Sequence, residues 1–172
     1  MRIEQIYSYR HAESILTVEY AQEKAELEQV FSTVNWIPKR KKKRKRKGKV
    51  VATLDINQKA TNKAIENEFL VLGWEKQPTI VSNSQSQLKA DYKKRELQVE
   101  VQFGNMARWY TDVFKFLLSY SADDIEVGIL VVPMHHIAKR IDENVVNYER
   151  VQRELPYAKM AVTIPIWLLG LG

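Results

Sequence analysis

Residues 88–105 read LKADYKKRELQVEVQFGN, and they decide the fold that the sequence predicts. Two strand-like pieces, residues 88–92 and 96–103, flank a short basic turn. Along the second piece apolar and polar side chains alternate, which is typical of a strand with one face in a core. The stretch therefore predicts a β-hairpin whose second strand buries its apolar side chains and presents a row of polar ones on the other face.

The segments on either side predict helices and further strands. Helical spacing of apolar residues occurs in residues 19–34, 58–72, 105–120 and 145–155. Strand-like patterns occur in residues 2–9, 50–54, 125–132 and 161–169. The stretch 125–132 is almost wholly apolar, which predicts a central strand buried on both faces, and Pro165 predicts an edge or a bulge in the last strand. This order of elements predicts an α/β fold, a mixed β-sheet flanked by helices.

Length and composition bound the organisation of the chain. With 172 residues, 45% of them hydrophobic, the chain has material for a single domain over residues 1–172. Cysteine is absent, which excludes a disulfide scaffold, a cysteine-ligated zinc site and a cysteine nucleophile. No apolar run approaches the roughly 20 residues of a membrane span, and the first residues show no signal-peptide pattern. We therefore expect a cytoplasmic protein with no membrane partner.

The positive charge is concentrated in one segment. The chain has 27 basic and 21 acidic side chains, a net charge of +6. Ten of the basic residues lie close together: Lys39, Arg40, Lys41, Lys42, Lys43, Arg44, Lys45, Arg46, Lys47 and Lys49. Without them, 17 basic residues remain against 21 acidic ones, so the rest of the chain is acidic. Mutual repulsion predicts an extended, solvated loop over residues 38–49, and a polyanion such as nucleic acid is its expected partner.

Two carboxylates fall in the hairpin with a spacing that suggests chemistry. Glu100 lies on the second strand, and Asp91 lies on the first. Because a hairpin places its strands side by side, we expect the two carboxylates to reach one shared point. Paired carboxylates repel each other unless a cation lies between them, and their oxygen atoms suit Mg²⁺. Such a metal polarises a phosphoryl oxygen and lowers the pKa of a bound water, which is the chemistry of phosphodiester hydrolysis.

The same pattern has a plainer interpretation. A glutamate between two glutamines on one strand face, with an aspartate near the turn, is also typical of the solvated face of an antiparallel hairpin. Asp91 and Glu100 would then be ordinary surface acids. On that interpretation the basic run makes the chain a non-catalytic DNA-binding protein or an RNA-binding protein.

Residues 91–105 resemble the active-site signature of the BglII and BstYI type II restriction endonucleases, which belong to the PD-(D/E)XK nuclease superfamily. The shared features are the Asp-x8-Glu-Val-Gln-Phe spacing and Gln102, which stands where most of the superfamily has a lysine. The resemblance extends to residues 62–74, 125–134 and 164–171, so it spans nearly the whole chain. It implies the PD-(D/E)XK core, with a mixed sheet flanked by helices.

That resemblance implies a role for each position of the motif. Asp91 and Glu100 would bind Mg²⁺, and the backbone carbonyl of Val101 would be a further ligand. Gln102 would help to place the attacking water or the scissile phosphate. Because a neutral amide cannot act as a general base, the metal or the phosphate itself would activate the water. Asn105 would either contact DNA or cap the helix that follows.

The resemblance also implies an activity and its partners. It predicts a Mg²⁺-dependent type II restriction endonuclease that cleaves double-stranded DNA at a short palindrome, and it suggests GATC at the centre of that site. A palindrome predicts a homodimer, and restriction in a prokaryote predicts a partner DNA methyltransferase. The alternative within the same fold is a nuclease of repair, junction resolution or homing. The basic run departs from the family pattern, and we expect it to contact the DNA backbone.

Overall fold

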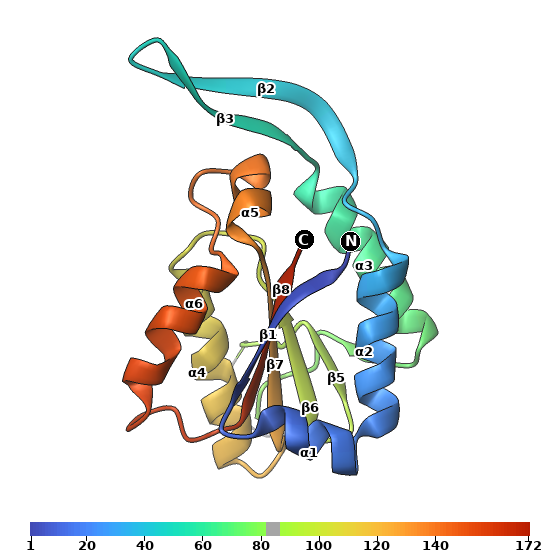
Figure 1. The fold of residues 1–172 in the computed structure, drawn as a ribbon. Helices are drawn as coiled ribbons and strands as arrows, with labels where there is room; N and C mark the ends of the chain where they lie inside the picture. The colour runs from blue at the N-terminus through green and yellow to red at the C-terminus, as the bar shows by residue number, and fades with distance from the viewer. Residues whose placement is uncertain (82–86) are drawn as a thin grey trace.

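The computed structural model describes residues 1–81 and 87–172, and its centre is a six-stranded mixed β-sheet (Figure 1). In sheet order the strands are β1 (Ile3–Tyr9), β8 (Ile166–Leu171), β7 (Val127–Pro133), β6 (Leu97–Val101), β5 (Tyr92–Lys94) and β4 (Glu75–Lys76). β8, β7 and β6 run parallel to one another, whereas β1, β5 and β4 pair antiparallel with their neighbours. The predicted mixed sheet flanked by helices is therefore confirmed.

Helices cover both faces of this sheet (Figure 1). One face carries α1 (Ala12–Glu19), α2 (Ala21–Thr33) and α3 (Gln58–Val71), and the other carries α4 (Arg108–Ser121) and α6 (Tyr148–Glu154). Two shorter helices are α5 (His135–Ile141) and η1 (Leu155–Ala158). All four predicted helices are present with shifted ends, and α1, α5 and η1 are additions to them. Among the described residues, no helix combines the length and the apolar character that a membrane crossing requires.

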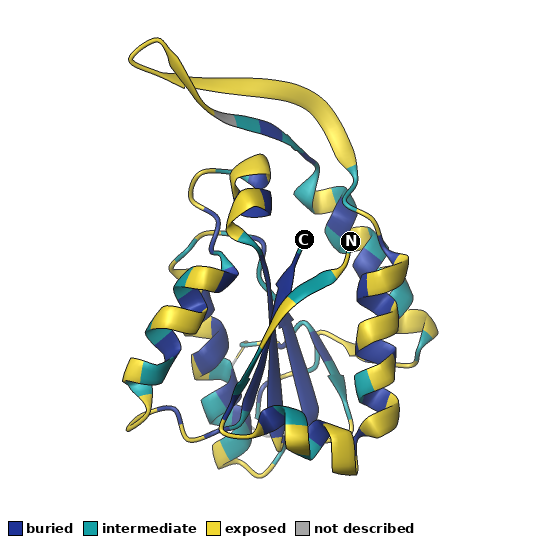
Figure 2. Cartoon of the chain, viewed as in Figure 1, coloured by how far each residue is buried: buried dark blue, intermediate teal, exposed yellow. Residues whose placement is uncertain are grey.

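Buried residues make up most of the sheet and the helix faces that lie against it (Figure 2). Because strand side chains alternate, β6 turns Leu97 and Val99 toward the cluster that contains α2 and α3. The same alternation turns Gln98 and Glu100 toward α4. β7 is buried along its whole length, as its apolar sequence predicts. The hairpin strand that carries a candidate acid is thus covered by helices on both faces.

The last strand corrects one expectation. β8 begins directly after Pro165 and lies between β1 and β7, so it is neither an edge strand nor bulged at the proline. Pro165 precedes the ladder, where its missing N–H costs no strand hydrogen bond. Its carbonyl accepts a hydrogen bond from the N–H of Gly128 at 3.0 Å. The proline therefore marks the start of a central strand.

The basic run forms a strand, which corrects the loop predicted over residues 38–49. β2 (Pro38–Arg46) pairs antiparallel with β3 (Lys49–Ile56) in a separate hairpin that projects from the body (Figure 1). Lys47 and Gly48 close the turn with φ of 50° and 75°, as the tight turns of β-hairpins require. β3 is rich in β-branched residues, and every residue of β2 is exposed. Solvent therefore screens the repulsion while the paired backbones stabilise the strand.

Candidate active site

The β5–β6 hairpin sets the two candidate carboxylates opposite each other. Tyr92 pairs with Val99, so Asp91, one residue earlier, faces Glu100, one residue later. The turn between the strands has two residues and lies slightly later than predicted. Oδ2 of Asp91 accepts a hydrogen bond from the N–H of Val101 at 2.8 Å. Both acids line the same cavity.

Glu100 is buried beneath α4. Its side chain is 1% exposed, and so is that of Gln98, which excludes the solvated strand face of the plainer interpretation. The amide of Gln98 donates to Oε1 of Glu100 at 2.9 Å, and the hydroxyl of Ser119 donates to the Gln98 oxygen at 2.7 Å. Nζ of Lys115 lies 2.6 Å from Oε2 of Glu100. The carboxylate is therefore fixed in orientation by one amide and one ammonium.

Both candidate acids have raised pKa values, chiefly because of burial. Burial raises the pKa of Glu100 well above its usual range, the charge of Asp91 adds to the rise, and Lys115 opposes it. Burial also raises the pKa of Asp91, although the hydrogen bond from Val101 and the charge of Lys115 both lower it. A site in which two facing acids hold raised pKa values favours a bound cation or a proton.

Gln102 is tied to α4. Its Nε2 donates to Oδ2 of Asp112 at 2.6 Å, and its Oε1 accepts from the N–H of Gly104 at 2.9 Å. A Cβ at position 104 would stand 2.8 Å from that oxygen, so the glycine leaves room for the amide to fold back. The backbone N–H of Gln102 donates to the carbonyl of Val131 and extends the pairing with β7. The side chain is therefore held in place at the cavity wall.

The sequence did not lead us to predict two residues of this cluster. Asp112 and Lys115 lie on α4, form an ion pair at 3.1 Å, and reach the polar face of β6. Together with Ser119 they repeat at positions i, i+3 and i+7, which places them on one helix face. That polar stripe on an otherwise amphipathic helix was the available signal, because a buried helix face normally carries apolar residues.

A cavity of about 650 Å³ opens in front of the acids. The hairpin and α4 supply the walls already described, and α3 closes the third side with residues that include Lys63 and Glu66. Glu66 forms ion pairs with Lys63 and with Lys76 of β4, the latter at 2.9 Å. These contacts hold α3 against the sheet edge and occupy the Glu66 carboxylate.

The donor set suits a hard divalent ion. Asp91 and Glu100 offer carboxylate oxygens, and Val101, between Glu100 and Gln102, offers a backbone carbonyl beside them. Within residues 1–81 and 87–172, no group of three or more His, Cys, Asp or Glu side chains is arranged to hold a metal. Two carboxylates and a carbonyl, completed by water, fit Mg²⁺, which binds few protein ligands and keeps several waters.

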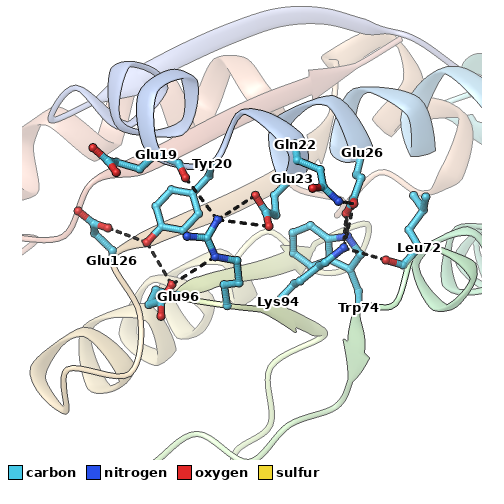
Figure 3. A network of polar contacts seen from close by, with 11 residues as sticks. Glu19, Tyr20, Gln22, Glu23, Glu26, Leu72, Trp74, Lys94, Glu96 and Glu126 are labelled. Atoms are coloured by element: carbon cyan, nitrogen blue, oxygen red, sulfur yellow. Dashed lines mark hydrogen bonds and ion pairs between the residues drawn. The ribbon is translucent and has the colours of Figure 1, made fainter.

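The far end of the same hairpin is clamped by α2 (Figure 3). Nζ of Lys94 lies 2.8 Å from both carboxylate oxygens of Glu26, which also accepts from the indole N–H of Trp74 at 2.9 Å. Arg95 forms an ion pair with Glu23 at 3.3 Å. These contacts hold the turn rigidly, and they thereby support the position of the acids at the other end.

Asn105 contacts the turn before α4. Its Oδ1 accepts from the N–H of Ala107 at 2.8 Å, and its carbonyl accepts from the N–H of Arg108 at 2.9 Å. The helix itself begins at Arg108, so Asn105 stabilises the turn that leads into α4 and is not the N-cap residue. Its side chain remains exposed, in reach of a ligand.

The basic run lies apart from the acids. None of its residues is among those that line the cavity in the described part of the chain. Arg44 forms an ion pair with Glu143 at 3.1 Å, and Arg140 of α5 pairs with Asp55 of β3 at 2.8 Å. The Arg140 pair joins the base of the hairpin to α5, and the Arg44 pair joins β2 to the segment that follows α5. The hairpin then leads directly into α3, which forms one wall of the cavity.

Two solved structures of a restriction endonuclease have a similar fold. The chain resembles restriction endonuclease BglII in complex with a DNA 16-mer, with a TM-score of 0.80, 24% identity, and coverage of 100% of this chain and 78% of that one. It also resembles free BglII, with a TM-score of 0.70, 23% identity, and coverage of 100% and 80%. No curated protein matches the chain.

The sequence model of the family described as restriction endonuclease BglII/BglIII matches residues 4–171. The chain therefore belongs to the BglII/BglIII family of restriction endonucleases, and its class is that of type II site-specific deoxyribonucleases. The predicted family and fold are confirmed.

Proposed function

We infer that the protein cleaves double-stranded DNA in a Mg²⁺-dependent reaction, at a short palindrome with GATC as the suggested centre. The observation that carries this inference is the facing pair Asp91 and Glu100, with pKa values raised by burial, at the wall of a polar cavity. Residues 1–172 would act as one endonuclease domain. Family membership in the BglII/BglIII endonucleases supports the same reaction class.

Each residue of the motif has a task in this reaction. Asp91, Glu100 and the carbonyl of Val101 would hold Mg²⁺, which when bound polarises the phosphoryl oxygen and acidifies a water. Gln102 holds one amide hydrogen bond to Asp112 and orients the water or the scissile phosphate. Its neutral amide takes no proton, so it positions the reactants.

The basic hairpin and Asn105 would bind the DNA backbone. The hairpin residues in this role are Lys39, Arg40, Lys41, Lys42, Lys43, Arg44, Lys45, Arg46, Lys47 and Lys49. Their exposure along β2 supports contacts with phosphates, which raise affinity and salt sensitivity without reading sequence. Asn105 has an exposed side chain in the turn before α4, where it would contact DNA.

A palindromic substrate calls for a homodimer with one active site for each strand. α4 is the expected interface, because Tyr110 and Phe114 are half exposed on it although they are large and aromatic. The mass in solution at micromolar protein tests this, and a 20.1 kDa monomer with and without DNA would contradict it. A DNA methyltransferase of the same specificity is the expected functional partner.

The decisive experiment is digestion of a long viral genome that contains every palindromic hexanucleotide. The lanes contain Mg²⁺, EDTA, and the Asp91→Ala variant in Mg²⁺. Discrete fragments that vanish in both controls support the proposal, and sequencing their ends identifies the site. A smear that vanishes in both controls favours a less specific nuclease. Intact DNA with gel retardation would contradict catalysis and favour a DNA-binding protein.

A further inference from the structure

Lys115 has no part in the function proposed so far, although it lies at the centre of the cluster. Its ammonium lies 2.6 Å from Glu100 and 3.1 Å from Asp112, and its side chain is 13% exposed. It comes from α4, whereas Glu100 comes from β6, so the contact is tertiary. A lysine that is largely buried loses hydration, which costs free energy unless nearby carboxylates compensate its charge.

The ammonium of Lys115 contacts the carboxylate oxygen of Glu100 that Gln98 does not contact. Oε1 of Glu100 accepts from Gln98, and Oε2 is taken by Lys115. Both oxygens of the carboxylate are therefore in contact with neighbouring side chains. A divalent ion held by Glu100 would compete with Lys115 for Oε2, because two cations at one oxygen repel each other.

Asp112 provides a second position for the ammonium. Its Oδ1 already contacts Lys115, and its Oδ2 contacts Gln102. When Lys115 leaves Glu100, Asp112 retains it at the cavity wall beside Gln102. The cavity then holds a fixed positive charge that the neutral Gln102 does not supply. Positive charge at this wall stabilises the negative charge that develops on a phosphate under attack.

We propose that Lys115 is a positioning residue that holds Glu100, would yield Oε2 of Glu100 to a divalent ion, and would then remain on Asp112 as a positive charge at the wall of the cavity beside Gln102. The proposal rests on the proposed function, since it assigns Lys115 a task in that reaction.

Metal affinity separates this role from a purely structural one. Mn²⁺ is titrated into the DNA-free protein by calorimetry, for the wild type and for Lys115→Gln. Removal of the competing ammonium is expected to tighten Mn²⁺ binding by about fivefold or more. Unchanged or weaker binding by a folded variant would overturn the proposal. Lys115→Met serves as a second uncharged variant if Lys115→Gln does not fold.

Cleavage at saturating Mg²⁺ tests the second half. The single-turnover rate of Lys115→Gln is expected to fall by about 10²-fold while the Mg²⁺ concentration at half-maximal rate decreases. A rate equal to that of the wild type would overturn the role after metal binding. If the wild type cleaves no DNA, the proposed function fails, and the Mn²⁺ comparison still decides whether Lys115 competes for Glu100.

Lys94 supplies a matched control. It is also a largely buried lysine in an ion pair with a glutamate, at 2.8 Å from Glu26. Lys94→Gln should lower the melting temperature and leave Mn²⁺ affinity unchanged, because Lys94 lies at the far end of the hairpin. A fivefold tightening in this variant as well would show that the effect follows from lost stability, and it would contradict the proposal.

A double variant that moves the positive charge from position 115 to position 102 tests whether the cavity wall needs that charge. Gln102 and Lys115 bond the two oxygens of the same carboxylate, Asp112, so a lysine at either position reaches it. The double variant Gln102→Lys with Lys115→Gln should recover about tenfold of the lost rate. A double variant no faster than Lys115→Gln would count against a need for positive charge at this wall.

Discussion

The two ends of the β5–β6 hairpin hold buried acids in different charge environments. At the turn, Glu26 faces Lys94, and Glu23 faces Arg95 (Figure 3). Burial alone would raise the pKa of Glu26, but hydrogen bonds from Lys94 and its other partners lower it below the usual value. At the cavity end, Lys115 is the positive charge that lowers the pKa values of Asp91 and Glu100. Burial has the larger effect and raises both pKa values.

The difference separates acids that stabilise the fold from the acids for which we propose a catalytic role. An acid whose charge is matched lowers the free energy of the folded state at neutral pH. An acid that is buried without a full match raises that free energy, and a bound cation relieves the cost. The ion pairs at the turn end therefore stabilise the fold. At the cavity end the buried carboxylates raise the free energy of the folded state, and a bound metal ion would lower it.

The largest expected effect comes from Asp91→Asn. The amide oxygen keeps the hydrogen bond from Val101, while the variant loses a proposed metal ligand and a partly buried charge. Cleavage should fall by at least about 10³-fold in single-turnover assays. The free energy of unfolding at pH 7 should rise by about 1 kcal/mol in urea titrations. A variant that keeps its activity, or that loses stability, would contradict the contrast between the two ends.

Glu26→Gln should have the opposite signature. The amide keeps a hydrogen bond from Trp74 but leaves Lys94 buried without its counter-charge. The free energy of unfolding should fall by about 2 kcal/mol in urea titrations. Cleavage measured well below the melting temperature should stay within about twofold of the wild type, since the cavity is at the other end. A stable variant would show that the clamp contributes little.

The two ends should also differ in how stability depends on pH. The folded-state pKa of Glu100 lies above its ordinary value of 4.5, so its contribution is complete below pH 4.5 and is lost as the pH rises toward the folded pKa. The pKa of Glu26 is lowered, so its contribution is present above pH 4.5 and is lost on acidification.

In EDTA, Glu100→Gln should therefore gain stability over the wild type as the pH rises above 4.5, by about 1 kcal/mol. Glu26→Gln should instead approach the wild type as the pH falls below 4.5. Urea unfolding from pH 3.5 to 8 measures both trends. Parallel curves for the two variants would remove the distinction between the ends.

The basic hairpin gives the smallest expected effect on stability, because solvent rather than packing balances its charge. Lys41→Gln with Lys43→Gln should change the free energy of unfolding by less than about 0.5 kcal/mol. The same pair should reduce the slope of log affinity for DNA against log salt by about two. Filter binding from low to moderate salt measures the slope, with Lys159→Gln as an exposed control. An unchanged slope would show that this strand does not contact phosphates.

Much of the fold followed from local patterns. Alternation along residues 96–103 specified a strand, and an apolar run specified the buried β7. The prediction of a loop over residues 38–49 was wrong. It considered the repulsion between the basic side chains but not the pairing of their backbone with β3. Pro165 was also assigned to a strand that begins one residue later. In both cases pairing between segments decided the outcome.

The sequence by itself determined that Asp91 and Glu100 face each other across an antiparallel hairpin, since the spacing of a short hairpin sets which residues are opposite. The strand predicted over residues 88–92 begins only at Tyr92, so Asp91 directly precedes β5. Only the tertiary structure decided that the face carrying Glu100 is buried, because α4 packs over it and brings Lys115 and Asp112 into contact with the motif. Burial and the number of neighbouring charges set a pKa, and both depend on segments that are distant in the chain.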